Sequence, residues 1–328
     1  MINSTERSDI LVFNCYLCHV RYLLTCYVYS TKIGEISDIS KCFENFVSQA
    51  LGVLTRIYAA ELRHFMKKIF IVLLLFLFSL EFVKGQTSKL GYEISDSAGV
   101  LELVKWERED SIVDLTKEEN LKQVKAIGNC CFVFNDYIKT VILPEGVEII
   151  NGRAFDTCKN LHHIYLPNSL RIIGQNSFNM CENLRLDSLP PNLKRIEYGA
   201  FWDCCRITIS KIPNTVTYIG GKAFTLCESI QELVLPDSII EIKERTFAGC
   251  KGLKKIKLPN SLQTIEKYAF ARCLSLDEIS LPASIQKIGI QAFIGCTSLR
   301  LVILPPKVEV ANNAFDLCKN LVIKEIQK

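Results

Sequence analysis

From residue 144 onwards, a Leu-Pro step (Ile-Pro in one copy) recurs at a constant spacing, and this regularity limits the possible folds more than any other feature. Every gap between successive prolines is 23 residues. A fixed period of this length predicts a solenoid, in which each repeat forms one coil. One coil cannot bury its own apolar edge, whereas stacked coils bury a continuous core. The prolines are Pro144, Pro167, Pro190, Pro213, Pro236, Pro259, Pro282 and Pro305.

Apolar residues keep fixed offsets within each repeat. In the repeat that starts at Pro259 they include Leu262, Ile265, Phe270 and Leu276. Stacking turns each offset into a column of side chains, and the phenylalanine column is the most regular one. From the second repeat onwards its members are Phe155, Phe178, Phe201, Phe224, Phe247, Phe270, Phe293 and, one residue early, Phe315.

The pattern also extends upstream of the first proline. Leu121 takes the place of the proline there, and Val124, Ile127 and Phe132 keep their offsets. The sequence therefore predicts nine coils of 23 residues over residues 121–328, with an atypical first coil and a shortened last coil. A chain of 328 residues that is 49% hydrophobic is long enough to bury such a core.

The end of each repeat alternates as a β-strand does. Segment 253–258 reads L-x-x-I-x-L, so alternation points Ile256 inward and Lys255 and Lys257 outward. Pro259 ends the strand because it has no backbone N–H to donate. We expect the L-x-x-I segment after the proline to be a second short extended piece, and the A-F-x-x-C segment to be a helical turn.

The full repeat, L-P-x-x-L-x-x-I-x-x-x-A-F-x-x-C-x-x-L-x-x-I-x, resembles the BspA-like, treponemal-type leucine-rich repeats over about residues 121–327. The resemblance implies a right-handed leucine-rich-repeat solenoid with short parallel strands. That family consists mostly of exported bacterial cell-surface proteins, with relatives in some protists, and several members are implicated in adhesion to host proteins. It therefore implies a binding module without naming a partner.

The chain before the repeats contains a targeting signal. A basic segment, 66–68, precedes the apolar run 69–80, and residues of small or medium size follow at Val83 and Gly85. The apolar run is short for a membrane span. We therefore predict that translation starts at residue 66, that residues 66–85 are a signal peptide, and that the mature protein is exported to the cell surface, the periplasm or the medium.

Residues 1–65 lack the repeat and are then an extension that the mature protein does not contain. The alternative is a cytosolic segment ahead of an uncleaved anchor, in which case the protein contacts a membrane only through residues 66–85. Residues 86–120 precede the leucine-rich-repeat domain, 121–328, and we expect them to be a lead-in that covers the apolar edge of the first coil.

Cysteines form a second column, three residues after each phenylalanine. Exported proteins often use cysteine in disulfides. Here, equivalent positions on neighbouring coils lie roughly 4.8 Å apart with parallel side-chain directions, which suit a disulfide poorly. A ladder of buried free thiols is the favoured interpretation, and disulfides or metal ligation between coils are the alternatives. The column is Cys158, Cys181, Cys204, Cys227, Cys250, Cys273, Cys296 and Cys318.

The sequence offers little that is typical of catalysis, cofactors or nucleic acid. The formal charge of +4 is small, and no stripe of basic residues with interleaved aromatics is present. The pair His162–His163 lacks any accompanying nucleophile, metalloprotease or phosphate-loop motif. The C-x-x-C-H motif at 15–19 lacks a second ligand pair with the spacing of a zinc site. We expect no catalytic residues, no cofactor, no metal and no nucleic-acid partner.

A solenoid keeps its specificity on the outward positions of its strands. These positions are apolar and aromatic in the first coils and charged in the middle ones, and a row of exposed apolar groups is typical of a contact surface. Coverage of this row by the lead-in or a crossing loop is the alternative. The predicted partner-binding residues are Thr140, Ile142, His163, Tyr165, Lys211 and Val234.

Two coils break the inward row. Asp187 and Ser210 stand where other coils have isoleucine or leucine, and a buried carboxylate is costly unless it is paired. Either the two polar side chains hydrogen-bond to each other, or the strand bulges and turns Leu186 and Ile209 inward. We favour the bulge.

These patterns together predict a non-catalytic protein that binds a protein or glycan partner at the cell envelope, in the manner of an adhesin. A structural envelope protein without a discrete ligand is the first alternative, and an enzyme inhibitor or periplasmic chaperone is a weaker one.

Overall fold

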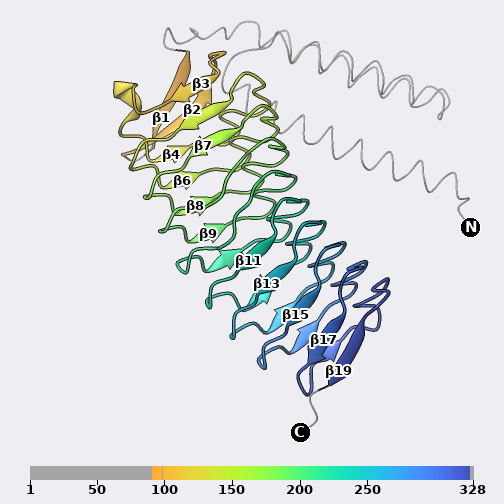
Figure 1. Cartoon of the computed structure of the whole chain (residues 1–328). Helices are drawn as coiled ribbons and strands as arrows, with labels where there is room; N and C mark the ends of the chain where they lie inside the picture. Colours follow the sequence, from red (N-terminus) through yellow and green to blue (C-terminus); the bar gives the residue numbers. More distant parts are fainter. Residues whose placement is uncertain (1–90, 98, 326–328) are drawn as a thin grey trace, which may run out of the picture. The chain divides into compact units, whose positions relative to one another are not determined.

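The computed structural model describes residues 91–97 and 99–325, and the predicted extension and signal peptide lie outside these residues. The described chain winds into an elongated solenoid whose strands lie on two sides (Figure 1). Coil one runs from Leu121 to Leu143, and each later coil starts at one of the eight prolines. The nine predicted coils are confirmed, and the lead-in adds one further turn before them.

The strands of the L-x-x-I-x-L segments form what we call the front of the solenoid. They pair in parallel with their neighbours, as predicted, and fall into three short sheets: β3-β5-β7, β11-β13 and β15-β17-β19. The front strands are β3 (Ile112–Asp114), β5 (Thr140–Ile142), β7 (His163–Tyr165), β11 (Glu232–Val234), β13 (Lys255–Lys257), β15 (Glu278–Ser280), β17 (Leu301–Leu304) and β19 (Val322–Glu325).

The L-x-x-I segments form a second set of strands, which we call the back. Their pairing is also parallel, and the set ends at the N-terminal side in an antiparallel hairpin of β1 and β2. The back strands are β1 (Tyr92–Ser97), β2 (Val100–Trp106), β4 (Ala126–Ile127), β6 (Ile149–Ile150), β8 (Ile172–Ile173), β9 (Arg195–Ile196), β10 (Tyr218–Ile219), β12 (Glu241–Ile242), β14 (Thr264–Ile265), β16 (Lys287–Ile288) and β18 (Glu309–Val310).

The predicted helical turn at A-F-x-x-C is wrong, and the described residues contain only one short 3-10 helix, η1 (Glu119–Leu121). The segment is a run of turns with two left-handed residues in each of coils one to eight, such as Arg153 (φ 57°) and Thr157 (φ 61°). Its backbone bonds to the next coil: the Phe155 N–H donates to the Ser177 carbonyl over 2.8 Å. This pairing between coils replaces the bonds that a helix would make within itself.

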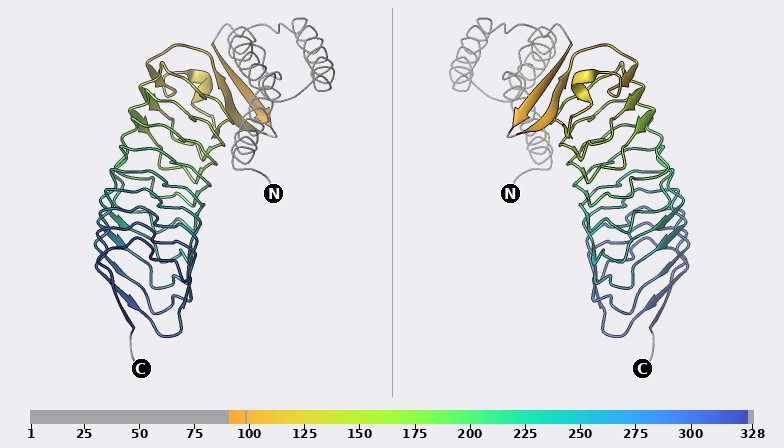
Figure 2. Two further views of the ribbon diagram at one scale, coloured as in Figure 1. Left: turned by 90° about the vertical axis from the view of Figure 1, so that its right-hand side faces the viewer. Right: turned by 90° about the vertical axis from the view of Figure 1, so that its left-hand side faces the viewer.

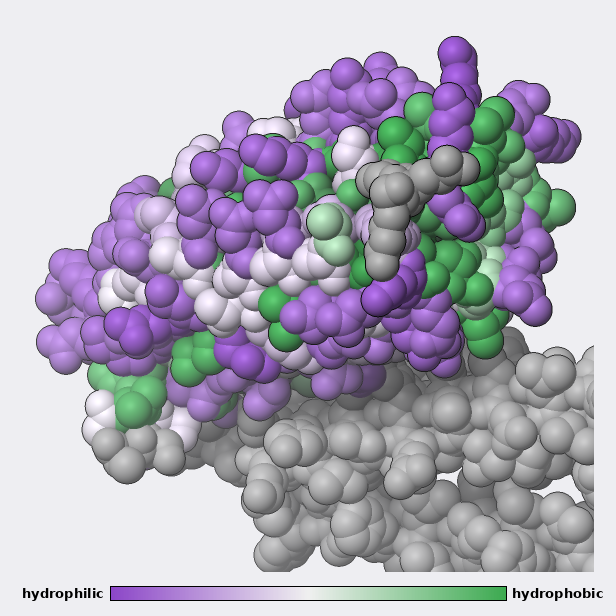
Figure 3. Space-filling view, turned by 90° about the horizontal axis from the view of Figure 1, so that it is seen from below, coloured by the Kyte–Doolittle hydropathy of each residue, from purple (hydrophilic) through white to green (hydrophobic). Residues whose placement is uncertain are grey.

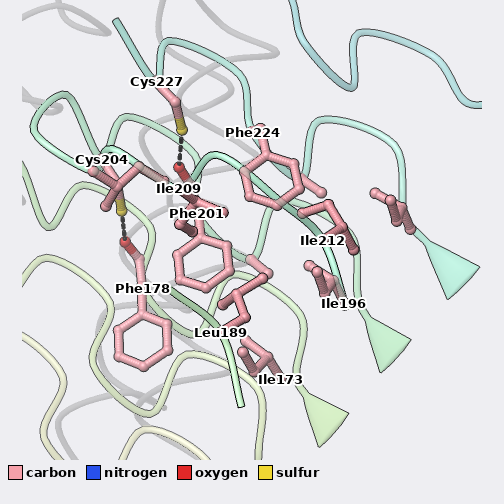
Figure 4. Packing of buried hydrophobic residues seen from close by; sticks show 14 of the residues in the cluster. Ile173, Phe178, Leu189, Ile196, Phe201, Cys204, Ile209, Ile212, Phe224 and Cys227 are labelled. Atoms are coloured by element: carbon pink, nitrogen blue, oxygen red, sulfur yellow. Dashed lines mark hydrogen bonds between the residues drawn. The ribbon is translucent and has the colours of Figure 1, made fainter. Parts of the chain in front are cut away.

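The phenylalanine column forms the centre of the core, as predicted. Neighbouring rings stack nearly parallel, with centroids 4.8 Å apart for Phe132 and Phe155 and 5.7 Å apart for Phe224 and Phe247. Figure 4 shows isoleucines of the back strands packing beside these rings. The eight phenylalanines from Phe132 to Phe293 are at most 1% exposed, so the column is a dry stack.

Cysteines line the same core as free thiols. Each column thiol donates to the phenylalanine carbonyl of the preceding coil; the distance from Cys204 Sγ to the Phe178 oxygen is 3.0 Å (Figure 4). Burial raises the pKa of Cys250 to about 12, so this thiol stays protonated at neutral pH. The bond to the carbonyl explains why a small side chain with a weak donor fits this position.

The hairpin of β1 and β2 extends the aromatic stack beyond coil one. Tyr92 stacks on Trp106 with ring centroids 5.8 Å apart, and Trp106 packs at the same distance against Phe132. The Arg108 guanidinium lies over both outer rings, 5.1 Å and 5.0 Å from their centroids. The core therefore continues from the first coil into the lead-in. Figure 2 shows the hairpin at this end of the solenoid from two sides.

The two coils that lack a front strand are coils three and four. Asp187 and Ser210 are exposed there, whereas Ile209 is fully buried and Leu186 is half-buried against the core. The predicted bulge is therefore confirmed. Exposure of Asp187 avoids the cost of a buried carboxylate, and an apolar neighbour fills the inward position in its place.

Candidate interaction surface

Four of the six predicted binding residues lie together on the front of coils one and two. In the parallel register, Thr140 is opposite His163 and Ile142 is opposite Tyr165. Tyr165 is 60% exposed, His163 is exposed, and the two residues on β5 are half-buried. Because alternation points all four side chains to the same side of the sheet, they form one continuous surface.

Strand β3 adds an apolar residue that the sequence patterns missed. Ile112 is 63% exposed and is opposite Thr140 in the register of β3 and β5. Its distance of 28 residues from Thr140 departs from the repeat of 23, which hid the strand in the lead-in. We call Ile112, Thr140, Ile142, His163 and Tyr165 the front patch.

Charged groups border the front patch on both sides. Asp114 is opposite Ile142, and hydrogen bonding from the Thr116 hydroxyl (2.6 Å) lowers the pKa of its carboxyl, so the group is charged at neutral pH. Lys139 and Arg185 are both exposed, and the backbone of Arg185 forms an isolated parallel β-bridge with that of His163. The patch is thus an apolar and aromatic centre with a mixed charged border, an arrangement typical of protein interfaces.

Lys211 and Val234 lie apart from the other four predicted residues. Their backbones form an isolated parallel β-bridge between coils four and five, and Lys211 is exposed while Val234 is half-buried. The bulged segments around Asp187 and Ser210 separate them from β7, and both of those polar residues are exposed. The six predicted residues therefore form two groups rather than one row.

The other end of the front is also apolar. Leu301, Ile303 and Val322 are 37%, 43% and 52% exposed, and Leu301 is opposite Val322 in the register of β17 and β19. Several hydrophobic side chains are visible at the surface on the right of Figure 3. We call these three residues the C-terminal front patch.

In the other front strands that follow a column cysteine, the first outward residue lies five residues after that cysteine, as His163 does after Cys158. Strand β19 departs from this spacing. Counting five residues past Cys318 places Ile323 on the outward row, but Ile323 is opposite the fully buried Val302. The last coil is one residue shorter on this side as well, so the count is wrong by one position. Ile323 belongs to the inward row and is 46% exposed at the end of the stack.

Side chains that could ligate a metal ion do not cluster in the described part of the solenoid. Within residues 91–97 and 99–325, no group of three or more His, Cys, Asp or Glu residues could hold a metal ion. The ring Nδ1 of His162 lies 2.6 Å from the backbone carbonyl oxygen of Asn160, two residues earlier. None of the helices described is long and apolar enough to cross a membrane.

Comparison with known proteins identifies the repeat. The profile described as the BspA type leucine rich repeat region, in six copies, matches residues 111–230 and 217–328. A leucine-rich repeat protein from Bacteroides ovatus ATCC 8483 is 28% identical, with a TM-score of 0.60 over 72% of this chain and 70% of that one. A Treponema pallidum leucine-rich repeat protein is 23% identical, with a TM-score of 0.51 over 66% of this chain and 91% of that one. No curated protein matches the chain.

Proposed function

Because the chain belongs to the BspA-type leucine-rich repeat family, we propose that it is an exported, non-catalytic protein that binds a protein or glycan partner through the front patch. The observation that carries this proposal is the front patch, in which Tyr165 (60% exposed) and Ile112 (63% exposed) lie at diagonal corners of one parallel sheet, with strand β5 between them. A contiguous exposed apolar surface with a polar border is typical of a site that a partner covers.

The geometry of the front supports this proposal energetically. Tyrosine is among the residue types enriched at binding hot spots, and a few such anchors supply most of the affinity of an interface. Strand side chains are held by parallel pairing on both sides of β5, so little backbone freedom remains to be lost on binding. Lys211 and Val234 would contribute a second, weaker contact area.

The alternative is a structural envelope protein without a discrete ligand. Binding distinguishes the two: we would probe immobilised full-length protein with purified extracellular-matrix proteins and with isolated envelope polysaccharides. A saturable interaction with one of them supports the proposal. Absence of saturable binding to either class favours the structural role.

Once a partner has been identified, substitutions in the front patch test whether the partner binds there. Tyr165→Ala combined with Ile112→Ser should weaken binding at least tenfold, which is about 1.4 kcal/mol. Both residues are largely exposed, so the melting temperature should hardly change.

A matched control is available on the same side of the solenoid. Leu301→Ser combined with Ile303→Ser removes exposed apolar groups of the C-terminal front patch and should leave affinity unchanged. If the control weakens binding and the Tyr165 variant does not, the partner docks at the other end of the front.

Export has its own test, since it rests on segment 66–85 alone. The N-terminus of the protein isolated from its native source should lie near Gln86. Peptides from residues 1–60 in the mature protein, detected by mass spectrometry, would show that the signal-peptide prediction is wrong.

A further inference from the structure

The ladder of back strands stops at one junction between coils. Strand β10 in coil five pairs with β9, and β12 in coil six pairs with β14, but β10 and β12 do not pair with each other. The back is therefore divided into a seven-stranded and a four-stranded sheet. Every other pair of neighbouring back strands from β4 to β18 is joined.

Backbone hydrogen bonds show what is missing at this junction. Between coils six and seven, the Gln263 N–H donates to the Ile240 carbonyl and the Glu266 N–H donates to the Ile242 carbonyl, both over 2.8 Å. The junction between coils four and five has the equivalent pair. Between coils five and six the donors would be Ile240 and Lys243, and within the described chain neither makes this bond.

The rest of the same junction stays connected. The Phe224 N–H donates to the Thr246 carbonyl over 2.9 Å, and the Leu235 N–H on the front donates to the Lys257 carbonyl over 3.1 Å, as in a regular solenoid. The ring centroids of Phe224 and Phe247 are 5.7 Å apart, the widest spacing between stacked phenylalanines in the described core. Coils five and six are therefore separated on the back while remaining joined elsewhere.

Thr246 supplies a physical cause for this separation. Coils five and seven have alanine at the equivalent position, Ala223 and Ala269, whereas Thr246 is 1% exposed. Its hydroxyl donates to the Lys243 carbonyl over 2.9 Å and lies 3.5 Å from the Gly220 oxygen of coil five. The larger side chain thus stands between the two back segments, where a densely packed core tolerates little additional volume.

We propose that the junction between coils five and six is a hinge, which opens on the back and is held by the front and by the phenylalanine column. The hinge separates the front patch from the C-terminal front patch, so its motion changes the angle between the two surfaces. Rigid bodies joined by a few backbone positions that absorb the motion are a common form of domain closure.

Amide hydrogen exchange in the full chain tests whether the back of this junction is open, because amides without a stable hydrogen bond exchange faster. The amides of Ile240 and Lys243 should exchange at least about tenfold faster than those of Gln263 and Glu266, their equivalents one coil later. Equal protection at the two junctions would overturn the proposal.

Substitution of the threonine tests the cause. Thr246→Ala should restore protection at Ile240 and Lys243 to the level of the next junction, while the amides of coil seven stay unchanged. Thr225→Ala, which also removes a buried threonine of the same region, should leave the fast exchange in place. If Thr246→Ala leaves exchange as fast as before, Thr246 is not the cause and the hinge as proposed is wrong.

Discussion

The inward and outward residues of the front strands obey different rules, and neighbouring residues of β7 show the contrast. Ile164 is 6% exposed and continues a row of inward apolar residues that repeats from coil to coil. Tyr165 is 60% exposed, and no other coil has a tyrosine at the equivalent position. The repeated residues account for the fold. The residues that do not repeat distinguish one coil from another, and they are where a solenoid acquires specificity.

The largest expected effect is on the inward side. Phe247→Ala should lower the free energy of unfolding by about 3–5 kcal/mol, because it leaves a cavity in the stacked column. Asn260→Ala changes an exposed turn residue one coil later and should cost little. Urea denaturation of both variants makes the comparison, and equal effects would mean that the phenylalanines do not carry the core.

The reactivity of the column cysteines is a second test of burial on the inward side. Seven of the eight column thiols are buried, and burial raises the pKa of Cys204 and Cys250 among them, so a thiol reagent should modify the buried thiols only after unfolding. Cys205 is half-buried, and burial together with the Asp203 carboxylate raises its pKa to about 12, which should slow its reaction too. Peptide mapping without reductant that finds Cys250 joined to Cys273 would contradict the account.

The turns form a third region, where the backbone and not the side chain is repeated. Gly295 has φ of 71°, and Leu226 holds the same position in coil five with φ of 62°. Gly295→Ala should destabilise the protein by about 1 kcal/mol, since a Cβ would meet nothing closer than 3.6 Å and only the left-handed backbone is penalised. Leu226→Gly should show a smaller effect of opposite sign in the same melts, and equal stability of all three proteins would contradict this explanation.

The inward side could be predicted from sequence because burial restricts residue type at a fixed period. The period of 23 located the phenylalanine column, and the cost of burying Asp187 predicted the bulge. The turns could not be predicted in this way. Arg153 and Thr157 adopt left-handed backbone that their residue types do not favour, because pairing with the next coil imposes it.

The outward side was only partly predictable for a related reason. Alternation identified Tyr165 and His163, whose strand belongs to a regular coil. It missed Ile112, because strand β3 lies outside the 23-residue period. It also placed Lys211 in one row with Tyr165 and His163, although the bulged coils three and four lie between them. Exposure depends on neighbouring coils as well as on the strand's own pattern, so it needs the assembled structure.

The measurement that tests the central claim most directly compares Ile164→Ala with Tyr165→Ala, two adjacent residues of one strand. Ile164→Ala should lower the free energy of unfolding by about 2–5 kcal/mol and leave the partner affinity of the folded fraction unchanged. Tyr165→Ala should change stability by less than about 0.5 kcal/mol and weaken partner binding. Denaturation and binding curves that show the reverse, or the same loss in both variants, would contradict the division into a repeated core and a variable binding surface.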